Sequence, residues 1–220
     1  MRRPLVLEVA EAALGPWCDR LQLNLTQALQ IHPGQSAQSL HRDENMWGGH
    51  KGHMEYLVNV MWPFGPYRAG NGATVIHPGS QHGGAGDAGP TCAETDAGDA
   101  LVFLGSTLHG GGADRSVPRT GMAVSDCLGW LKPYENQWLV YPPAVARGFS
   151  PELARLARYQ PRRPKPGNDE GQRPSVLPGG EPDEYLSAVD EFLPRQAAAL
   201  RARADAASNK NGGFSGGAAA

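Results

Sequence analysis

Two histidines and an aspartate occupy positions from which they could bind one metal ion. His41 and Asp43 are two residues apart in the segment HRD, and in an extended chain such residues project to the same side. His109 follows the apolar run ALVFLGSTL and precedes three glycines, which predict a tight backbone turn around a site. Two imidazoles and one carboxylate on one face of the metal are the ligand set of non-haem iron(II) oxygenases. The sequence therefore predicts an iron site, and a catalytic centre, at His41, Asp43 and His109.

Arg119 is the candidate for binding an organic co-substrate. It lies at the start of another apolar run, and a guanidinium there can form a bidentate pair with the distal carboxylate of 2-oxoglutarate, whose keto-acid end would chelate the iron. Arg115 competes for this role but lies in the preceding loop. The alternative for Arg119 is an ordinary surface salt bridge. An HxD triplet by itself often arises by chance, so Arg119 strengthens the prediction of an iron site.

Short β-rich runs are expected to position these side chains. Valine, aromatic and other apolar residues gather between turn clusters at 56–62, 73–79, 99–105 and 119–131. The 29 glycines and 19 prolines punctuate these runs and leave little room for long helical periods. This spacing is typical of a jelly roll. We therefore expect an all-β core, a double-stranded β-helix of cupin-like form, with peripheral helices.

The character of the sequence changes near residue 150. SPELARLARYQ predicts a short helix capped by Ser150, with Pro151 in its first turn. A proline-, glycine- and charge-rich stretch follows, and then DEYLSAVDEFLPRQAAALRARADAA, which can form an amphipathic helix that Pro194 interrupts. We predict a double-stranded β-helix domain over 1–149, a helical and linker extension over 150–206, and a disordered tail over 207–220.

Composition limits the partners. The chain has 220 residues and a formal net charge of -2, so it has no basic field that would attract nucleic acid or an anionic membrane surface. Its three cysteines form no CxxC pair, which fits a reducing compartment. Glu8 and Glu11 interrupt the first apolar stretch, so it is interpreted as structure and not as a signal peptide. We expect a cytoplasmic protein with a small-molecule substrate; the oligomeric state is not indicated.

Several longer segments resemble the phytanoyl-CoA dioxygenase family, in the family's order. They are QSLHRDENMW (38–47), NGATVIHPGSQH (71–82), GDALVFLGSTLHGGGADRSVPRTG (98–121) and GWLKPYENQWL (129–139). The resemblance implies a jelly roll that binds iron(II) and 2-oxoglutarate. It also implies that oxidative decarboxylation by O2, which gives succinate and CO2, drives hydroxylation or desaturation of a second substrate.

Residue by residue, the resemblance implies iron ligation by the three candidates above and co-substrate anchoring by Arg119. It also implies that Gln38 and Thr74 hydrogen-bond the co-substrate, although either could instead make an ordinary turn or strand hydrogen bond. Asp43 disfavours halogenation, because related halogenases carry a small residue there. The family's name does not fix an acyl-CoA substrate.

Three further points stay open at this level. Trp47 and His50 follow the HRD segment closely and are candidates for substrate contact, while His50 and His53 have an HxxH spacing that fits a surface loop better than a second metal. A cupin-like metal-binding or isomerase domain is the competing class. Only 37 residues precede Gln38, fewer than the resemblance implies, so an amino-terminally truncated, inactive remnant is the third alternative.

Overall fold

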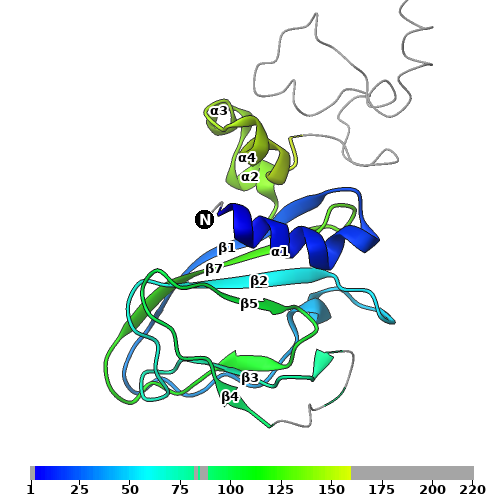
Figure 1. The fold of residues 1–220 in the computed structure, drawn as a ribbon. Helices are drawn as coiled ribbons and strands as arrows, with labels where there is room; N and C mark the ends of the chain where they lie inside the picture. Colours follow the sequence, from blue (N-terminus) through cyan, green and yellow to red (C-terminus); the bar gives the residue numbers. More distant parts are fainter. Residues whose placement is uncertain (1–2, 82–83, 85–88, 160–220) are drawn as a thin grey trace, which may run out of the picture. The chain divides into compact units, whose positions relative to one another are not determined.

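Two antiparallel sheets form the core of the computed structural model, which describes residues 3–81, 84 and 89–159. The larger sheet has the order β1 (Leu21–Ile31), β7 (Arg119–Leu128), β2 (Leu57–Pro63) and β5 (Leu101–Leu104). The smaller has the order β4 (Thr91–Cys92), β3 (Thr74–Ile76) and β6 (His109–Gly111). Figure 1 shows the smaller sheet lying opposite the larger one. The predicted all-β jelly-roll core is confirmed.

The helices are short, and they lie before β1, between β1 and β2, and after β7 in the sequence. The first unit, 1–142, contains α1 (Pro4–Leu14), η1 (Gly15–Trp17), η2 (Asp43–Met46) and α2 (Gln137–Val140). The second, 143–220, contains α3 (Pro143–Ala146) and α4 (Pro151–Leu156). No helix in the described ranges has the length and apolar character needed to cross a membrane.

The expected helix after residue 150 is present as α4. Its N-cap is Ser150, whose hydroxyl accepts a hydrogen bond from the Leu153 amide, and Pro151 begins the helix. The amphipathic segment around Pro194, the predicted tail and the boundary at 206 lie outside the described residues. The predicted division of the chain at 149 and 206 stays a prediction.

Each of the four predicted apolar runs contains a strand, but β1 was not predicted. Its sequence, LQLNLTQALQI, alternates apolar and polar residues through Leu21, Leu23 and Leu25, which is the period of a half-buried strand. A β-bulge between Leu23 and Leu25 interrupts the pairing of β1 with β7. β1 is thus the outer neighbour of the strand that begins with Arg119.

The register of the larger sheet places the cavity-facing side chains in rows, because directly opposed residues share a face. Along β7 the rows pass from Arg119 at one end to Ser125 near the other. In the first two rows, Ile31 of β1 lies opposite Arg119 of β7, and Leu29 lies opposite Gly121. Each of the other two rows crosses all four strands: one contains Gln27, Ala123, Met61 and Leu101, and the other contains Leu25, Ser125, Asn59 and Phe103. The sheet therefore presents a cation at one end and an amide and an aromatic ring at the other.

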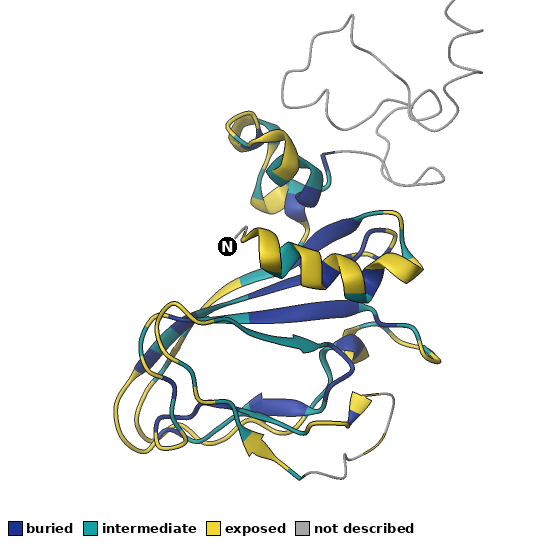
Figure 2. Cartoon of the chain, viewed as in Figure 1, coloured by how far each residue is buried: buried dark blue, intermediate teal, exposed yellow. Residues whose placement is uncertain are grey.

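A buried apolar cluster supports this end of the sheet. Ala10 and Leu14 of α1 pack with residues of β1, β2 and β7, among them Leu57 and Cys127. Figure 2 shows β2 as a largely buried strand and α1 as a helix that is exposed along its outer side. α1 thus packs against the end of the larger sheet next to the row of Asn59 and Ser125.

Gly121 is expected to tolerate no side chain. A Cβ added there would overlap the hydroxyl of Tyr67 and lie 2.7 Å from the carbonyl oxygen of Trp62. We expect Gly121→Ala to lower the free energy of unfolding by about 1–3 kcal/mol, the usual range for overpacking a core. Urea unfolding measures this. Gly65→Ala is the control, because nothing lies within 4 Å of a Cβ there; equal urea midpoints for the two variants would contradict the expectation.

Candidate active site

His41 and His109 lie directly opposite each other across the backbone. They form an isolated antiparallel bridge in which the His41 amide donates to the His109 carbonyl at 2.9 Å and the His109 amide donates to the His41 carbonyl at 3.0 Å. Their ring centroids are 4.5 Å apart. Two residues far apart in sequence are therefore held side by side by a pair of main-chain hydrogen bonds.

Both imidazoles are oriented by backbone carbonyls. Nδ1 of His41 lies 2.8 Å from the Ser39 oxygen, and Nδ1 of His109 lies 3.0 Å from the Thr107 oxygen. A carbonyl oxygen can only accept, so in each neutral ring Nδ1 carries the proton and Nε2 keeps its lone pair. This is the tautomer in which histidine binds a metal through Nε2.

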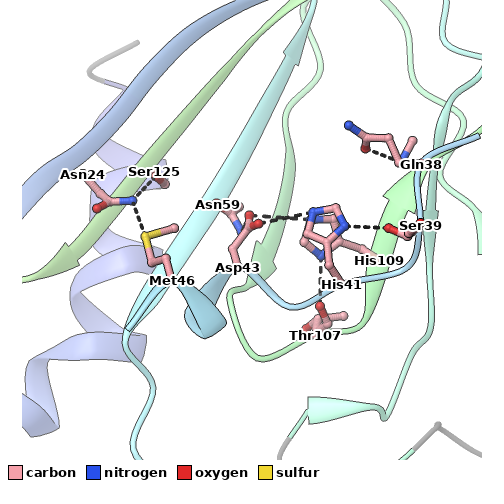
Figure 3. A network of polar contacts seen from close by, with 11 residues as sticks. Asn24, Gln38, Ser39, His41, Asp43, Met46, Asn59, Thr107, His109 and Ser125 are labelled. Atoms are coloured by element: carbon pink, nitrogen blue, oxygen red, sulfur yellow. Dashed lines mark hydrogen bonds and ion pairs between the residues drawn. The ribbon is translucent and has the colours of Figure 1, made fainter. Parts of the chain in front are cut away.

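Asp43 completes the cluster at the start of η2. Its Oδ1 lies 3.4 Å from Nε2 of His41, and its Oδ2 lies 3.6 Å from Nε2 of His109 (Figure 3). The three potential ligand atoms all lie within 4.8 Å of one another. The structure thus brings together the three residues predicted as ligands, and the donor set fits a mononuclear divalent ion.

The electrostatics favour the protonation states that a metal requires. Burial opposes ionisation of Asp43, but hydrogen bonds from His41 and Asn59 and the nearby imidazoles lower the pKa of its carboxyl. Burial lowers the pKa of His109. The hydrogen bond with Asp43 raises the pKa of His41. Metal binding needs the carboxylate ionised and the imidazoles neutral, so His41 is the ligand candidate at which protons compete most.

The guanidinium of Arg119 is buried and faces the same cavity. The residue is 6% exposed, its guanidinium carbon lies 4.4 Å from the ring centroid of Tyr67, and it lines the cavity at the first position of β7. Its Nε and Nη1 are buried with no hydrogen-bond partner among the described residues. Arg115, the competing candidate, is exposed in the loop. A surface salt bridge is therefore not the role of Arg119.

A cavity of about 260 Å³ lies between the candidate ligands and Arg119. Thr74 lines it from β3 and is buried, and Gln38 lines it from the segment before His41. The side-chain oxygen of Gln38 accepts from the Gly111 amide at 2.8 Å, so its amide N–H groups are what it can offer a ligand. The described residues that line the cavity are Leu25, Gln27, Leu29, Ile31, Gln35, Ser36, Gln38, His41, Asp43, Asn59, Val60, Met61, Thr74, Phe103, His109, Gly111, Gly112, Arg119, Ala123, Val124 and Ser125.

Trp47 and His50 do not line this cavity. Trp47 packs edge-to-face on Tyr56, with ring centroids 5.9 Å apart, and its indole N–H donates to the Lys132 carbonyl. His50 is exposed. The structure therefore gives no support to their expected contact with substrate.

The expected tight turn after His109 is wrong. Gly110 and Gly111 continue strand β6, and neither they nor Gly112 have a positive φ. They permit close approach instead: an added Cβ would lie 3.0 Å from the Gln38 side-chain oxygen at Gly111, and 2.8 Å from the Ala73 carbonyl oxygen at Gly112. The glycines let β6 pack between the 38–41 segment and β3.

Asn59 is a site residue that the sequence analysis missed. Its side-chain amide donates to Oδ2 of Asp43 at 2.9 Å. The available signal was a polar residue inside the apolar run YLVNVMW, since a buried polar side chain in a strand needs a partner.

The fold and the site together define a jelly roll with a candidate mononuclear metal centre. A sequence model described as phytanoyl-CoA dioxygenase matches residues 1–120. The chain therefore belongs to the phytanoyl-CoA dioxygenase family.

Individual relatives agree with this assignment. The chain is 32% identical over 173 residues to dioxygenase aneA of Aspergillus aculeatus, covering 73% of this chain and 58% of aneA. It is 33% identical over 193 residues to dioxygenase swnH1 of Metarhizium robertsii, covering 79% of this chain and 60% of swnH1. The chain thus spans less than two thirds of the length of these relatives.

Among solved structures, the chain is similar to ThoJ, a non-heme monooxygenase, in complex with nickel. The TM-score is 0.49 and the identity 20%, covering 61% of this chain and 54% of that one. It is also similar to EctD from S. alaskensis with 2-oxoglutarate and 5-hydroxyectoine, with a TM-score of 0.47, 17% identity, and coverage of 57% of this chain and 51% of that one.

Proposed function

We propose that this chain is a non-haem iron(II)- and 2-oxoglutarate-dependent dioxygenase that hydroxylates or desaturates a small organic metabolite. In hydroxylation, one atom of O2 enters the substrate as an alcohol oxygen and the other enters succinate, while the keto acid releases CO2. The observation that carries the proposal is the buried guanidinium of Arg119, whose Nε and Nη1 have no hydrogen-bond partner among the described residues and which faces the same cavity as the His41, Asp43 and His109 cluster. An unpaired buried charge is unfavourable unless a ligand completes it.

Each residue has a defined task. Nε2 of the two histidines and a carboxylate oxygen of Asp43 would hold the iron, which when bound supplies the activation of dioxygen. The Arg119 guanidinium would bind the distal carboxylate of 2-oxoglutarate in a bidentate pair. Thr74 and Gln38 line the cavity, and the Thr74 hydroxyl and the Gln38 amide N–H groups would add hydrogen bonds to the co-substrate. The protein thereby orients both reactants and restricts water around them.

The wall contributed by β1 favours an uncharged portion of the second substrate. Leu25, Leu29 and Ile31 line the cavity there, with the neutral amide of Gln27 between them. Apolar walls with a few neutral polar groups are usual for sites that take small organic molecules. The substrate portion that meets this wall would be apolar, with a hydrogen-bonding group opposite Gln27.

The competing interpretation, a cupin-like metal-binding domain, predicts a different environment for Arg119. A metal site that does not use 2-oxoglutarate has no need for a free cation in its cavity, and the arginine would pair with an acidic side chain of the protein. Nε and Nη1 of Arg119 have no such partner within the described ranges. This observation favours the co-substrate reading.

Anaerobic titration of the iron(II)-loaded protein with 2-oxoglutarate tests the proposal. We expect a weak visible metal-to-ligand charge-transfer band in the wild type, because the keto acid would chelate the iron. His109→Ala should abolish the band, and His32→Ala, at an exposed histidine, should leave it unchanged. A folded, iron-loaded wild-type protein that shows no band would contradict the proposal and favour the cupin-like or inactive-remnant reading.

A further inference from the structure

Asn59 donates a hydrogen bond to one oxygen of the Asp43 carboxylate. It is 8% exposed, and its amide N–H donates to Oδ2 at 2.9 Å, while Oδ1 lies 3.4 Å from Nε2 of His41 (Figure 3). A carboxylate that is free of such a donor can rotate about its terminal torsion, which is broad and has no sharp rotamer. The hydrogen bond from Asn59 therefore fixes the rotation of the carboxylate, with Oδ1 toward His41 and Oδ2 also facing Nε2 of His109 at 3.6 Å.

The backbone of Asn59 is fixed on both sides. β2 is an inner strand, and Asn59 is paired with Phe103 of β5 and with Ser125 of β7. The Ser125 hydroxyl accepts from the Asn24 side chain at 3.0 Å, so the neighbouring polar side chain has its own partner. This arrangement gives the Asn59 amide a defined position from which to reach Asp43.

The same row of the sheet also supports a second ligand candidate. The Phe103 ring packs edge-on against His109, with ring centroids 4.6 Å apart. Asn59 and Phe103 are neighbours in one row, so a rigid part of the larger sheet contacts both Asp43 and His109. Outer contacts of this kind orient metal ligands, and their removal typically lowers metal affinity or activity by about 10–100-fold.

We propose that Asn59 is a positioning residue for the metal centre. Its amide holds Oδ2 of Asp43 and so fixes the orientation of the carboxylate that would ligate the ion. The inference rests on the proposed function in that it needs a divalent metal at this cluster. It does not depend on the binding of 2-oxoglutarate.

Calorimetric titration with Ni(II), a redox-inert probe, tests the inference without turnover. Asn59→Leu keeps the side-chain size but removes the donor, and we expect it to raise the Ni(II) dissociation constant about 10–100-fold. Ser125→Ala is the matched control, because it removes a buried hydrogen bond from the same row without touching Asp43. Its dissociation constant should stay within about twofold of wild type, since no contact with a ligand candidate is lost. Asn59→Ala serves as a second variant, and thermal melts of the metal-free proteins accompany each titration.

The outcomes separate the two proposals. If the wild-type protein binds no Ni(II), the cluster is not a metal site, and both proposals are contradicted. Tight Ni(II) binding by wild type and by both Asn59 variants overturns only the role of Asn59. Unfolding of both Asn59 variants while Ser125→Ala folds would also overturn it, because Asn59 would then be needed for folding and not for positioning. Weaker Ni(II) binding by folded Asn59 variants, with the control unchanged, supports it.

Discussion

Arg119→Met is expected to stabilise the ligand-free protein and to weaken its binding of 2-oxoglutarate strongly. Two guanidinium nitrogens of Arg119 are buried without a partner among the described residues, and each such group costs about 1–3 kcal/mol. Methionine has a similar length and fills irregular space without a charge. The loss of stacking on Tyr67 offsets roughly 0.5–2 kcal/mol of the gain. We expect a net gain of about 1–2 kcal/mol, which corresponds to a rise in Tm of about 2–8 °C for a chain of this size.

The same substitution removes the proposed anchor for the co-substrate carboxylate. Hydrogen bonds to charged groups contribute about 1.5–3 kcal/mol each, so losing a bidentate pair should weaken 2-oxoglutarate binding by about 100-fold or more. Differential scanning fluorimetry measures the first effect and the charge-transfer titration measures the second. Arg115→Met, at an exposed loop position, should change neither. A lower Tm with 2-oxoglutarate binding retained would show that Arg119 is a structural residue.

Asp126→Asn is expected to remove a large pH dependence of stability. Asp126 is 4% exposed, and burial raises its pKa from 3.8 to about 7. The folded protein therefore binds more protons than the unfolded chain between about pH 4 and pH 7, so the carboxyl lowers the free energy of unfolding as the pH rises through this window. A pKa shift of about three units lowers the free energy of unfolding by about 4 kcal/mol at most. The loss is complete above the folded-state pKa.

Urea unfolding of wild type and Asp126→Asn at pH 5, 6, 7 and 8 measures this effect. The amide carries no charge, so the variant should be more stable than wild type by up to about 4 kcal/mol at pH 8. The advantage should shrink steadily toward pH 5. Glu8→Gln on the exposed side of α1 controls for the removal of one negative charge. A stability difference that does not change with pH would show that Asp126 is accommodated as an ionised group.

The candidate ligands could be predicted from sequence because their chemistry restricts residue type and spacing. The i, i+2 spacing of His41 and Asp43 suits one face of an extended chain, and Arg119 could be proposed as a cavity residue because it opens an apolar run. The role of Asn59 could not be predicted in this way. Its partner lies in another segment, and one sequence does not show that β2 passes beneath Asp43. The same holds for the contact of Gly121 with Tyr67, which depends on how two distant segments pack.

Two errors in the sequence analysis have identifiable causes. β1 has the alternating pattern of a strand, but Gln27 and Gln30 dilute its apolar character, so the run is less apolar than the segments in which strands were predicted. The glycines after His109 were interpreted through their backbone freedom. In the structure their small size matters instead, because Gly111 and Gly112 allow three backbone segments to approach each other.

The main-chain bridge between His41 and His109 forms a backbone frame for the site. This frame does not depend on the side chains at the two positions. The two reciprocal backbone hydrogen bonds remain whatever residues stand at these positions, provided neither is proline. Ligands can therefore be exchanged without dismantling the frame. Replacing His41 or Asp43 with a smaller residue would leave an opening at a defined place, which an added imidazole or carboxylate molecule could fill. The site is for this reason a suitable scaffold for engineered metal centres with new ligand sets.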